Sequence, residues 1–457
     1  MLIIRIMGMA SNIYISSLAG AKSMGIYHMV FSVFTFGITF ASSGTGFAVT
    51  RLIAEEKANE KSVIKKCLVI SWIMSAVGFG FFFFASEFAG EKLIRHPDGA
   101  LCLKILSFAL PCMASSSVMR GYFIAKRRAG LLTLTSIAEE SISIALSLAL
   151  LKYSAMPSYI CLITSCTISN LFAFVLDTAL CRMCIKKGTH LNKKARFRDI
   201  FAICVPIALG SYLRTGLVSC ENLIIPLQFA KFGTAEPVAE YGIIKAMAMP
   251  ILMFPTVFVQ AFSSMLVPEM SEMNSKGRAN GIRHVSLISL NAVTMFAFFI
   301  ALMLFKHHDI ISDSLYKEEG ASFYLGALSL LSVPMYLDTV ADSILKGLNL
   351  QNASLKYNIT DSALRIIYIL VFMPKFGPVS YIIMLYVSEI FNLTLSLNKA
   401  VKTTSLKIDF ATLLLKPLFC ACIALMFSAP LTQAFVYIGL YFMDNIKNRL
   451  TNAVKAV

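Results

Sequence analysis

Charged side chains are scarce in this chain of 457 residues, at 14% against about 25% in soluble domains. Acids are the scarcer kind, with 25 Asp and Glu against 41 Lys and Arg, and the net charge is +16. In a nucleic-acid-binding protein such an excess forms a patch on a folded polar domain, but here the cations stand in short clusters between apolar runs. With 57% hydrophobic residues, the composition excludes an ordinary soluble domain and indicates a polytopic membrane protein.

The common motifs of cofactor and catalytic sites are also missing. No GK[ST] follows the glycines of SSGTGFAVTR, so they match no phosphate loop, and neither HExxH nor a Ser/His/Asp arrangement occurs. The eleven Cys lie mostly inside apolar segments, and the one CxxC, Cys181 to Cys184, has no further ligands at zinc spacing. We therefore expect no cofactor, no metal site, no nucleic-acid partner and no enzymatic activity.

Apolar runs long enough to cross a bilayer fill the chain. A spanning helix needs roughly 20 mostly apolar residues. That length gives about fourteen helices, near 1–20, 26–50, 67–89, 101–125, 130–151, 157–181, 200–224, 241–267, 285–305, 322–345, 357–374, 378–397, 410–429 and 431–443. The fold class is accordingly an all-α polytopic membrane protein.

Basic residues concentrate in alternate loops. Most loop Lys and Arg lie in 51–66, 126–128, 182–198, 275–284, 346–356 and 399–407. Because cytoplasmic loops carry the excess of cations, these loops are predicted to face the cytoplasm, together with both termini. The first residues, MLIIRIMGMASNIYISSLAGA, could pass for a signal peptide, but Arg5 interrupts the apolar stretch and no polar mature domain follows. We expect the second half of a first helix whose beginning is missing.

The chain also repeats itself at an offset of about 222 residues. SYI at Ser158 and at Ser380 is followed at equal spacing by Asn170 and Asn392, and Pro111 with Arg120-Gly121 resembles Pro334 with Lys346-Gly347. Six helices per copy insert in the same orientation, which is an architecture of transporters with a site between two lobes. We expect an N-terminal lobe over 1–185, a basic cytoplasmic linker over 186–199, a C-terminal lobe over 200–400, and two C-terminal helices with a tail over 408–457.

Cations inside the apolar runs are the candidate binding residues. A charge at membrane depth is rare unless it lines a cavity or has a partner, and the guanidinium fork suits phosphate oxygens. Snorkelling of the side chain to the membrane interface is the alternative for each cation. The candidates for a pyrophosphate site are Arg5, Arg51, Arg214 and Lys245.

Acidic residues in the same runs have several possible roles. Glu221 lies seven residues beyond Arg214, on the same helical face but about 10 Å along the axis, and could neutralise another arginine or bind a coupling cation. Asp361 and Arg365 are spaced i,i+4 and predict a structural pair within one helix. The first-lobe equivalents are Glu139, Glu140 and Ser143, which keep the acid without the base and make either glutamate a candidate ion or proton site.

Several segments closely resemble the stage V sporulation protein B family. They are RIMGMASNIYISSLAGAKSMGIYHMVFSVFTF, SSGTGFAVTRLIAE, LPCMASSSVMRGYF, PIALGSYLRTGLVSCENLIIP, AEYGIIKAMAMPILMFP, FSSMLVPEMSE, PMYLDTVADSILKGL and YNITDSALRIIYIL, and they extend to about residue 410. This family belongs to the multidrug/oligosaccharidyl-lipid/polysaccharide (MOP) flippase superfamily and is related to lipid II flippases. The resemblance implies a MATE-like fold of fourteen helices in two lobes.

The resemblance also implies roles for individual residues. Arg5 falls on the RxxG motif of helix 1 in lipid II flippases, where the arginine lines the cavity, and Arg51 and Arg214 fall on family arginines. Three departures are visible: Ser11 and Asn12 stand where an Arg-Asp pair is frequent, Ser143 replaces an arginine, and Lys245 replaces a neutral residue or His.

The function expected is translocation of an undecaprenyl-pyrophosphate-linked saccharide, for spore cortex or cell envelope synthesis, by a monomer in the cell membrane. Its partners would be the lipid-linked substrate, membrane lipids, and a coupling cation or the membrane potential. Two alternatives stay open. One is a cation-coupled multidrug antiporter of the same superfamily, which would favour cavity carboxylates over cations, and the other is a membrane scaffold for envelope assembly without transport.

Overall fold

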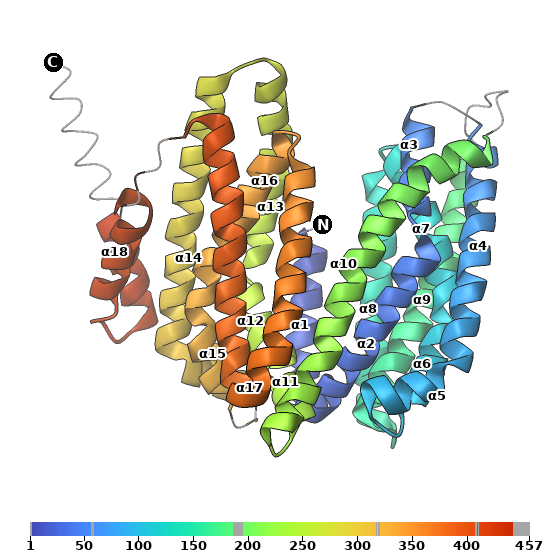
Figure 1. Cartoon of the computed structure of the whole chain (residues 1–457), viewed down its shortest axis with the longest axis horizontal. Helices are drawn as coiled ribbons and strands as arrows, with labels where there is room; N and C mark the ends of the chain where they lie inside the picture. The colour runs from blue at the N-terminus through green and yellow to red at the C-terminus, as the bar shows by residue number, and fades with distance from the viewer. Residues whose placement is uncertain are drawn as a thin grey trace. The chain divides into compact units, whose positions relative to one another are not determined.

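The computed structural model describes residues 2–55, 59–185, 195–316, 318, 320–406, 409 and 411–441, which fold into helices joined by short turns, with no strand among them (Figure 1). Most of the predicted basic linker (186–194) and the tail from 442 onward lie outside the described residues. The chain divides into two compact units, one over 3–246 and one from Met247 onward.

Unit 1 holds the first eleven helices and a short π-helix. They are α1 (Leu2–Ala19), α2 (Ala21–Ser42), α3 (Thr45–Ala54), α4 (Glu60–Phe84), α5 (Ser86–Phe88), η1 (Ala89–Ile94), α6 (Gly99–Ser107), α7 (Ala109–Ala125), α8 (Ala129–Tyr153), α9 (Ser158–Ile185), α10 (Phe197–Phe232) and α11 (Pro237–Gly242). Left-handed backbone at Ser43 and Gly44 separates α2 from α3. Its core lies among α3, α4 and α7 and includes Val63, Tyr122 and Phe123.

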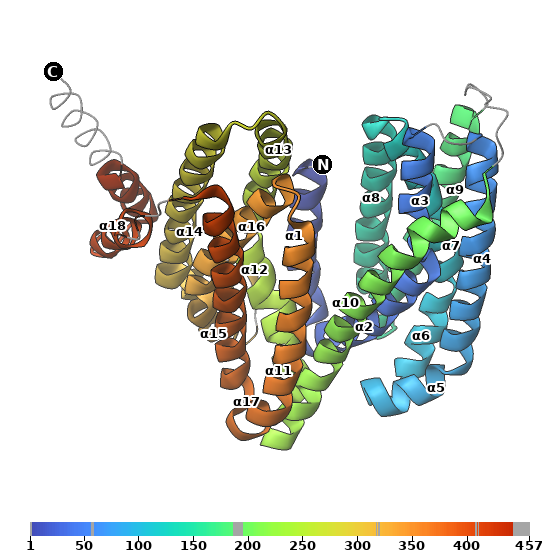
Figure 2. The same ribbon diagram turned by 45° about the horizontal axis from the view of Figure 1, so that its top comes forward.

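Unit 2 follows a second π-helix, η2 (Ile243–Ala248), which spans the boundary. Its elements are α12 (Met249–Met253), α13 (Thr256–Ser275), α14 (Ala279–Leu315), α15 (Ala321–Leu328), η3 (Ser329–Leu331), α16 (Ser332–Gly347), α17 (Gln351–Thr404), η4 (Ala411–Leu415) and α18 (Lys416–Ala424), and residues 430–441 are also helical. Its core includes Met270, Leu337 and Ile344, which lie on α13 and α16. Figure 2 shows these two helices beside α14.

Each of the fourteen predicted segments overlaps helix in the described residues, but 425–429 are not helical, and 410, 442 and 443 lie outside the described residues. Two of them, 357–374 and 378–397, are the halves of α17, which is interrupted at Gly377 between Pro374 and Pro378. Gly377 has φ 59° and ψ −146°, a conformation that residues with a Cβ rarely adopt. By length and apolar composition, the described part contains eight helices able to cross a membrane, or up to ten if each bent pair forms one span. The all-α polytopic class is confirmed, and the count of fourteen spans stays a prediction.

Close helix crossings rely on glycine. A Cβ on Gly121 of α7 would lie 2.4 Å from the carbonyl oxygen of Gly46 in α3, closer than real contacts allow. Likewise, a Cβ on Gly242 of α11 would lie 1.9 Å from the carbonyl oxygen of Ala21 in α2. The glycines therefore let these helix backbones touch, which fixes α3 against α7 and α2 against α11.

Helix α10 packs against other helices of unit 1 through hydroxyl contacts. Ser219 Oγ donates to the Ser32 carbonyl oxygen over 2.7 Å, and the hydroxyls of Tyr212 and Ser43 are 2.7 Å apart. The compact units consequently divide at residues 246 and 247, later along the chain than the predicted lobe boundary at 185–200. The division into two six-helix lobes stays a prediction.

Candidate functional site

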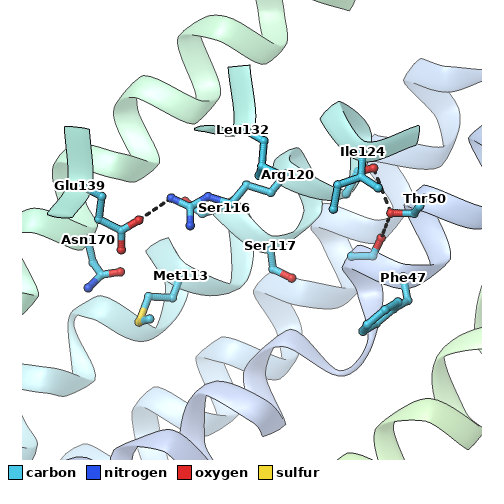
Figure 3. Close-up of a pocket in the computed structure, with 12 residues that line it drawn as sticks. Phe47, Thr50, Met113, Ser116, Ser117, Arg120, Ile124, Leu132, Glu139 and Asn170 are labelled. Carbon is cyan, nitrogen blue, oxygen red and sulfur yellow. Dashed lines mark hydrogen bonds and ion pairs between the residues drawn. The ribbon is translucent and has the colours of Figure 1, made fainter. Parts of the chain in front are cut away.

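A cavity of 440 Å³ lies between α3, α7, α8 and α9 of unit 1 (Figure 3). Its polar lining consists of Thr50, Ser116, Ser117, Arg120, Glu139 and Asn170, and apolar side chains such as Phe47, Met113, Ile124 and Leu132 complete it. The Thr50 hydroxyl donates to the carbonyl oxygens of Gly46 and Gly121 over 2.9 and 3.0 Å. The cavity thus lies beside the point where α3 and α7 cross at those two glycines.

Arg120 joins three helices at this cavity. Its Nη2 lies 2.5 Å from Oε2 of Glu139 in α8, and its Nε lies 3.0 Å from Oδ2 of Asp177 in α9. The Asp177 side chain is fully buried, and those of Arg120 and Glu139 are 25% and 22% exposed. One guanidinium therefore serves two carboxylates in a largely desolvated place, where breaking such a pair is costly.

A smaller, more polar cavity of 270 Å³ adjoins the first and shares Met113, Glu139 and Asn170 with it. Its other polar lining residues are Ser11, Asn12, Tyr27, Glu140, Ser143, Ser147 and Ser169. A Cβ on Gly8 of α1 would lie 3.0 Å from Glu140 Oε1, so this glycine lets α1 approach the carboxylate closely. Carboxylate, amide and hydroxyl oxygens together make a lining suited to a hard cation, a proton or water.

Unit 2 carries its own paired acid. Asp361 Oδ2 lies 3.2 Å from Arg365 Nε, one turn along α17, and Ser388 Oγ donates to both Asp361 oxygens at 2.8 and 2.9 Å. In unit 1 the position equivalent to Arg365 is Ser143, and the sequence predicts that Glu139 lacks a base. Glu139 has no basic partner in its own helix, but Arg120 of the neighbouring helix α7 is its partner.

The predicted pyrophosphate cations all belong to unit 1 and occupy different surroundings. Arg5 is exposed on α1, and Lys245 is partly buried in η2. Arg51 is exposed at the end of α3 and donates from Nε to Oε1 of Glu55 over 2.9 Å. Arg214 lies midway along α10 and is exposed. The four cations lie on four different elements, and none of them lines either of the two cavities around Arg120.

Arg214 points away from the contact between α10 and α2. The α2 side of α10 is marked by Tyr212 and Ser219, and by the Thr215 hydroxyl, 3.4 Å from that of Thr39. At about 100° per residue, Arg214 lies well around the helix from that side. Among the described residues no acidic side chain is paired with Arg214. Glu221, seven residues later, is 3% exposed.

Sequence reasoning missed Arg120 and Asp177 as site residues. Arg120 was noted only as the Arg120-Gly121 of the internal repeat, and Asp177 lies within the predicted apolar segment 157–181. An acid inside an apolar run is itself a signal, but its partner is 57 residues away on a helix that the sequence does not identify as a neighbour. In the described part of the chain, no group of three or more His, Cys, Asp or Glu could hold a metal ion.

Known proteins resemble this chain in sequence and in fold. Residues 1–274 match the model of the family described as polysaccharide biosynthesis protein. Stage V sporulation protein B of Bacillus subtilis (strain 168) is 21% identical over 398 residues, which are 82% of this chain and 76% of that protein. The family match covers more than half of the chain.

Two solved structures illustrate the fold. An inward-facing multidrug resistance MATE family transporter of the MOP superfamily has a TM-score of 0.69 at 15% identity, covering 88% of this chain and 98% of its own. A MOP superfamily transporter from Pyrococcus furiosus has a TM-score of 0.65 at 14% identity, covering 88% and 94%. The predicted MATE-like fold is thereby confirmed. This chain belongs to the polysaccharide biosynthesis protein family and is a multi-pass membrane protein with the fold of MOP superfamily transporters.

Proposed function

We propose that this protein is a flippase for a saccharide linked to undecaprenyl pyrophosphate and works by alternating access. The observation that carries the proposal is Arg214, a guanidinium exposed midway along an apolar helix and paired with no acid among the described residues. A cation at that depth costs about 2.5 to 3.5 kcal/mol on insertion scales. An anionic group of the substrate, bound in a water-filled path, offsets this cost. Membership of a polysaccharide biosynthesis family points to a lipid-linked sugar as the substrate that bears this group.

The pyrophosphate site would be built mainly from arginines of unit 1. Arg214 binds phosphate oxygens through its forked donors, which are stronger when they meet a charged acceptor. Arg5 and Arg51 supply further positive charge, with Arg51 released from its exposed contact to Glu55, a contact of small energetic value. Lys245 contributes a point charge. The prenyl tail stays in lipid, so only the head group needs a polar path.

The carboxylates are assigned to a different task. Arg120 already neutralises Glu139 and Asp177, so this arginine holds α7, α8 and α9 together and is not part of the pyrophosphate site. Glu140 faces the smaller, oxygen-lined cavity, where it would bind a coupling cation or proton. Glu221 is the second candidate for that role. We place the protein in the cell membrane as a monomer with both termini in the cytoplasm, and its product in spore cortex or cell envelope synthesis.

The carboxylates that line the smaller cavity favour the multidrug antiporter as the second candidate function, because cationic drugs need acids in their path. The two functions differ in the charge of the cargo. Purified protein in proteoliposomes is tested for translocation of a labelled undecaprenyl-pyrophosphate-linked saccharide, and expressing cells are tested for ethidium efflux. The flippase predicts the first activity without the second. Ethidium efflux without flipping supports the antiporter. Absence of both activities supports the membrane scaffold without transport.

A further inference from the structure

A third cavity of unit 1 is a groove that faces outward along α4, separate from the two cavities around Arg120. It is a groove of 490 Å³ lined by Lys61, Ile64, Lys65, Leu68, Val69, Trp72, Ile73 and Ile185. Seven of these residues follow one side of α4, and Ile185 closes the groove from the end of α9. Helix α4 is long and apolar enough to span a membrane, and only a third of its most apolar window is buried in the protein. The groove therefore faces lipid.

Two cations stand at one end of this groove. Lys61 and Lys65 are exposed and one helical turn apart, and no acidic side chain of the described residues pairs with either. The neighbouring Glu60 is directed inward, where it accepts from Tyr122 over 3.2 Å and pairs with Lys126. The positive charge at the end of the groove is thus left without a carboxylate from its own turn.

The other end of the groove is apolar and carries the single tryptophan of the chain, Trp72. Its side chain is 55% exposed, and Val69 and Ile73 beside it are 42% and 58% exposed. Trp72 lies seven residues beyond Lys65, which places it about 10 Å deeper along the helix axis. The groove consequently offers two cations at one depth and an apolar surface around Trp72 about 10 Å deeper along the helix axis.

We propose that this groove binds one anionic glycerophospholipid, with its phosphate at Lys61 and Lys65 and an acyl chain along Leu68 and Trp72. Lipid is the occupant that a membrane-facing apolar groove meets, and the paired lysines select an anionic head group over a zwitterionic one. In the orientation predicted by the basic loops, this end lies at the cytoplasmic surface, where anionic lipids attract basic residues. A second copy of the chain fits less well, because its own groove carries the same cations.

Trp72 makes the proposal directly measurable, since no other tryptophan contributes fluorescence. The full-length protein is reconstituted in mixed vesicles in which either the phosphatidylglycerol or the phosphatidylcholine carries bromine near the middle of its acyl chains. Bromine quenches the Trp72 emission where the brominated acyl chain contacts the indole ring. We expect brominated phosphatidylglycerol to quench more strongly than its mole fraction predicts, with a relative binding constant about 30-fold above that of phosphatidylcholine for two lysines.

Variants assign the preference to the groove. Lys61→Gln should lower the preference for phosphatidylglycerol roughly fivefold, and Lys61→Gln with Lys65→Gln should abolish it. Lys61→Arg with Lys65→Arg keeps both charges and should keep the preference. Lys152→Gln, at the exposed end of α8, is the matched control and should behave as wild type. Equal quenching by the two lipids in wild type, or an unchanged preference in the double Gln variant, would overturn the proposal. Transport is not measured, so the outcome is independent of the flippase assignment.

Discussion

Arg120 Nη2 and Glu139 Oε2 lie 2.5 Å apart, at the wall of the larger cavity of unit 1. Glu139 was a candidate ion site from sequence, and this contact gives it a structural partner. The same guanidinium also reaches Asp177, so the ion cluster ties the three helices around the cavity. Glu139 and Glu140 both line the adjoining cavity, and Glu139 is the one that pairs with Arg120.

Arg120→Ala should destabilise unit 1 severely. It leaves the fully buried Asp177 and the mostly buried Glu139 without their cation, a loss worth about 3 to 5 kcal/mol for a broken buried pair. Thermal unfolding in detergent, followed by the loss of the monodisperse peak, measures it. Adding Glu139→Gln and Asp177→Asn should restore part of the stability. An Arg120→Ala protein as stable as wild type would show that the cluster contributes nothing to the fold.

Gly121→Ala should separate α3 from α7. The new Cβ would lie 2.4 Å from the Gly46 carbonyl oxygen, so the backbones must move apart and the Thr50 hydrogen bonds are strained. We expect a loss of about 1 to 3 kcal/mol, as for other overpacked sites. Gly80→Ala in α4 is the control, because nothing lies within 4 Å of its Cβ position. Equal melting temperatures of the two variants would contradict this view of the crossing.

Asn59 caps the helix that carries the lipid groove. Its side-chain oxygen accepts from the backbone N–H groups of Lys61 and Ser62 at 3.0 and 3.4 Å. Asn59→Ala should cost about 1 kcal/mol and fray the turn that holds Lys61, whereas Asn59→Asp, which caps equally well, should not. Hydrogen exchange of the first turn of α4 reports the fraying. Identical exchange in both variants would argue against the cap.

His96, between η1 and α6, should make stability depend on pH. Its Nδ1 accepts from the Asp98 N–H over 3.3 Å, and burial lowers the pKa of the ring below its usual value, more than Asp98 raises it. The unfolded chain therefore binds more protons, so stability should fall as pH drops from about 6.5 toward the folded pKa. His96→Gln should flatten this part of the profile of melting temperature against pH. A profile that His96→Gln leaves unchanged would exclude this group.

Local patterns in the sequence predicted where most of the helices lie. Each apolar run became helix because its length and composition leave no other way to satisfy the backbone in a membrane. The pair of Asp361 and Arg365 could be predicted because i,i+4 spacing brings two side chains together within one helix. The interruption at Gly377 falls between the predicted segments 357–374 and 378–397, and Pro374 and Pro378 lie on either side of it.

Contacts between different helices could not be predicted from the sequence. Arg120 and Asp177 are distant in the chain, and helical periodicity gives the face of a residue without naming the helix opposite. Arg51 differs from these residues: its contact with Glu55 is local, at i,i+4 on an exposed turn, and its role as a cavity cation stays a prediction. The placement of α10 against α2 likewise rests on hydroxyl contacts such as Ser219 to Ser32 that no spacing rule predicts.

The most direct test of the flippase proposal is the translocation rate of a labelled undecaprenyl-pyrophosphate-linked saccharide by Arg214→Ala in proteoliposomes. Loss of one charge-assisted contact of about 1.5 to 3 kcal/mol predicts a rate at least tenfold below wild type, with the amount of inserted protein unchanged. Arg198→Ala, an exposed arginine in the first turn of the same helix, should keep the wild-type rate. Full translocation by Arg214→Ala would contradict the account.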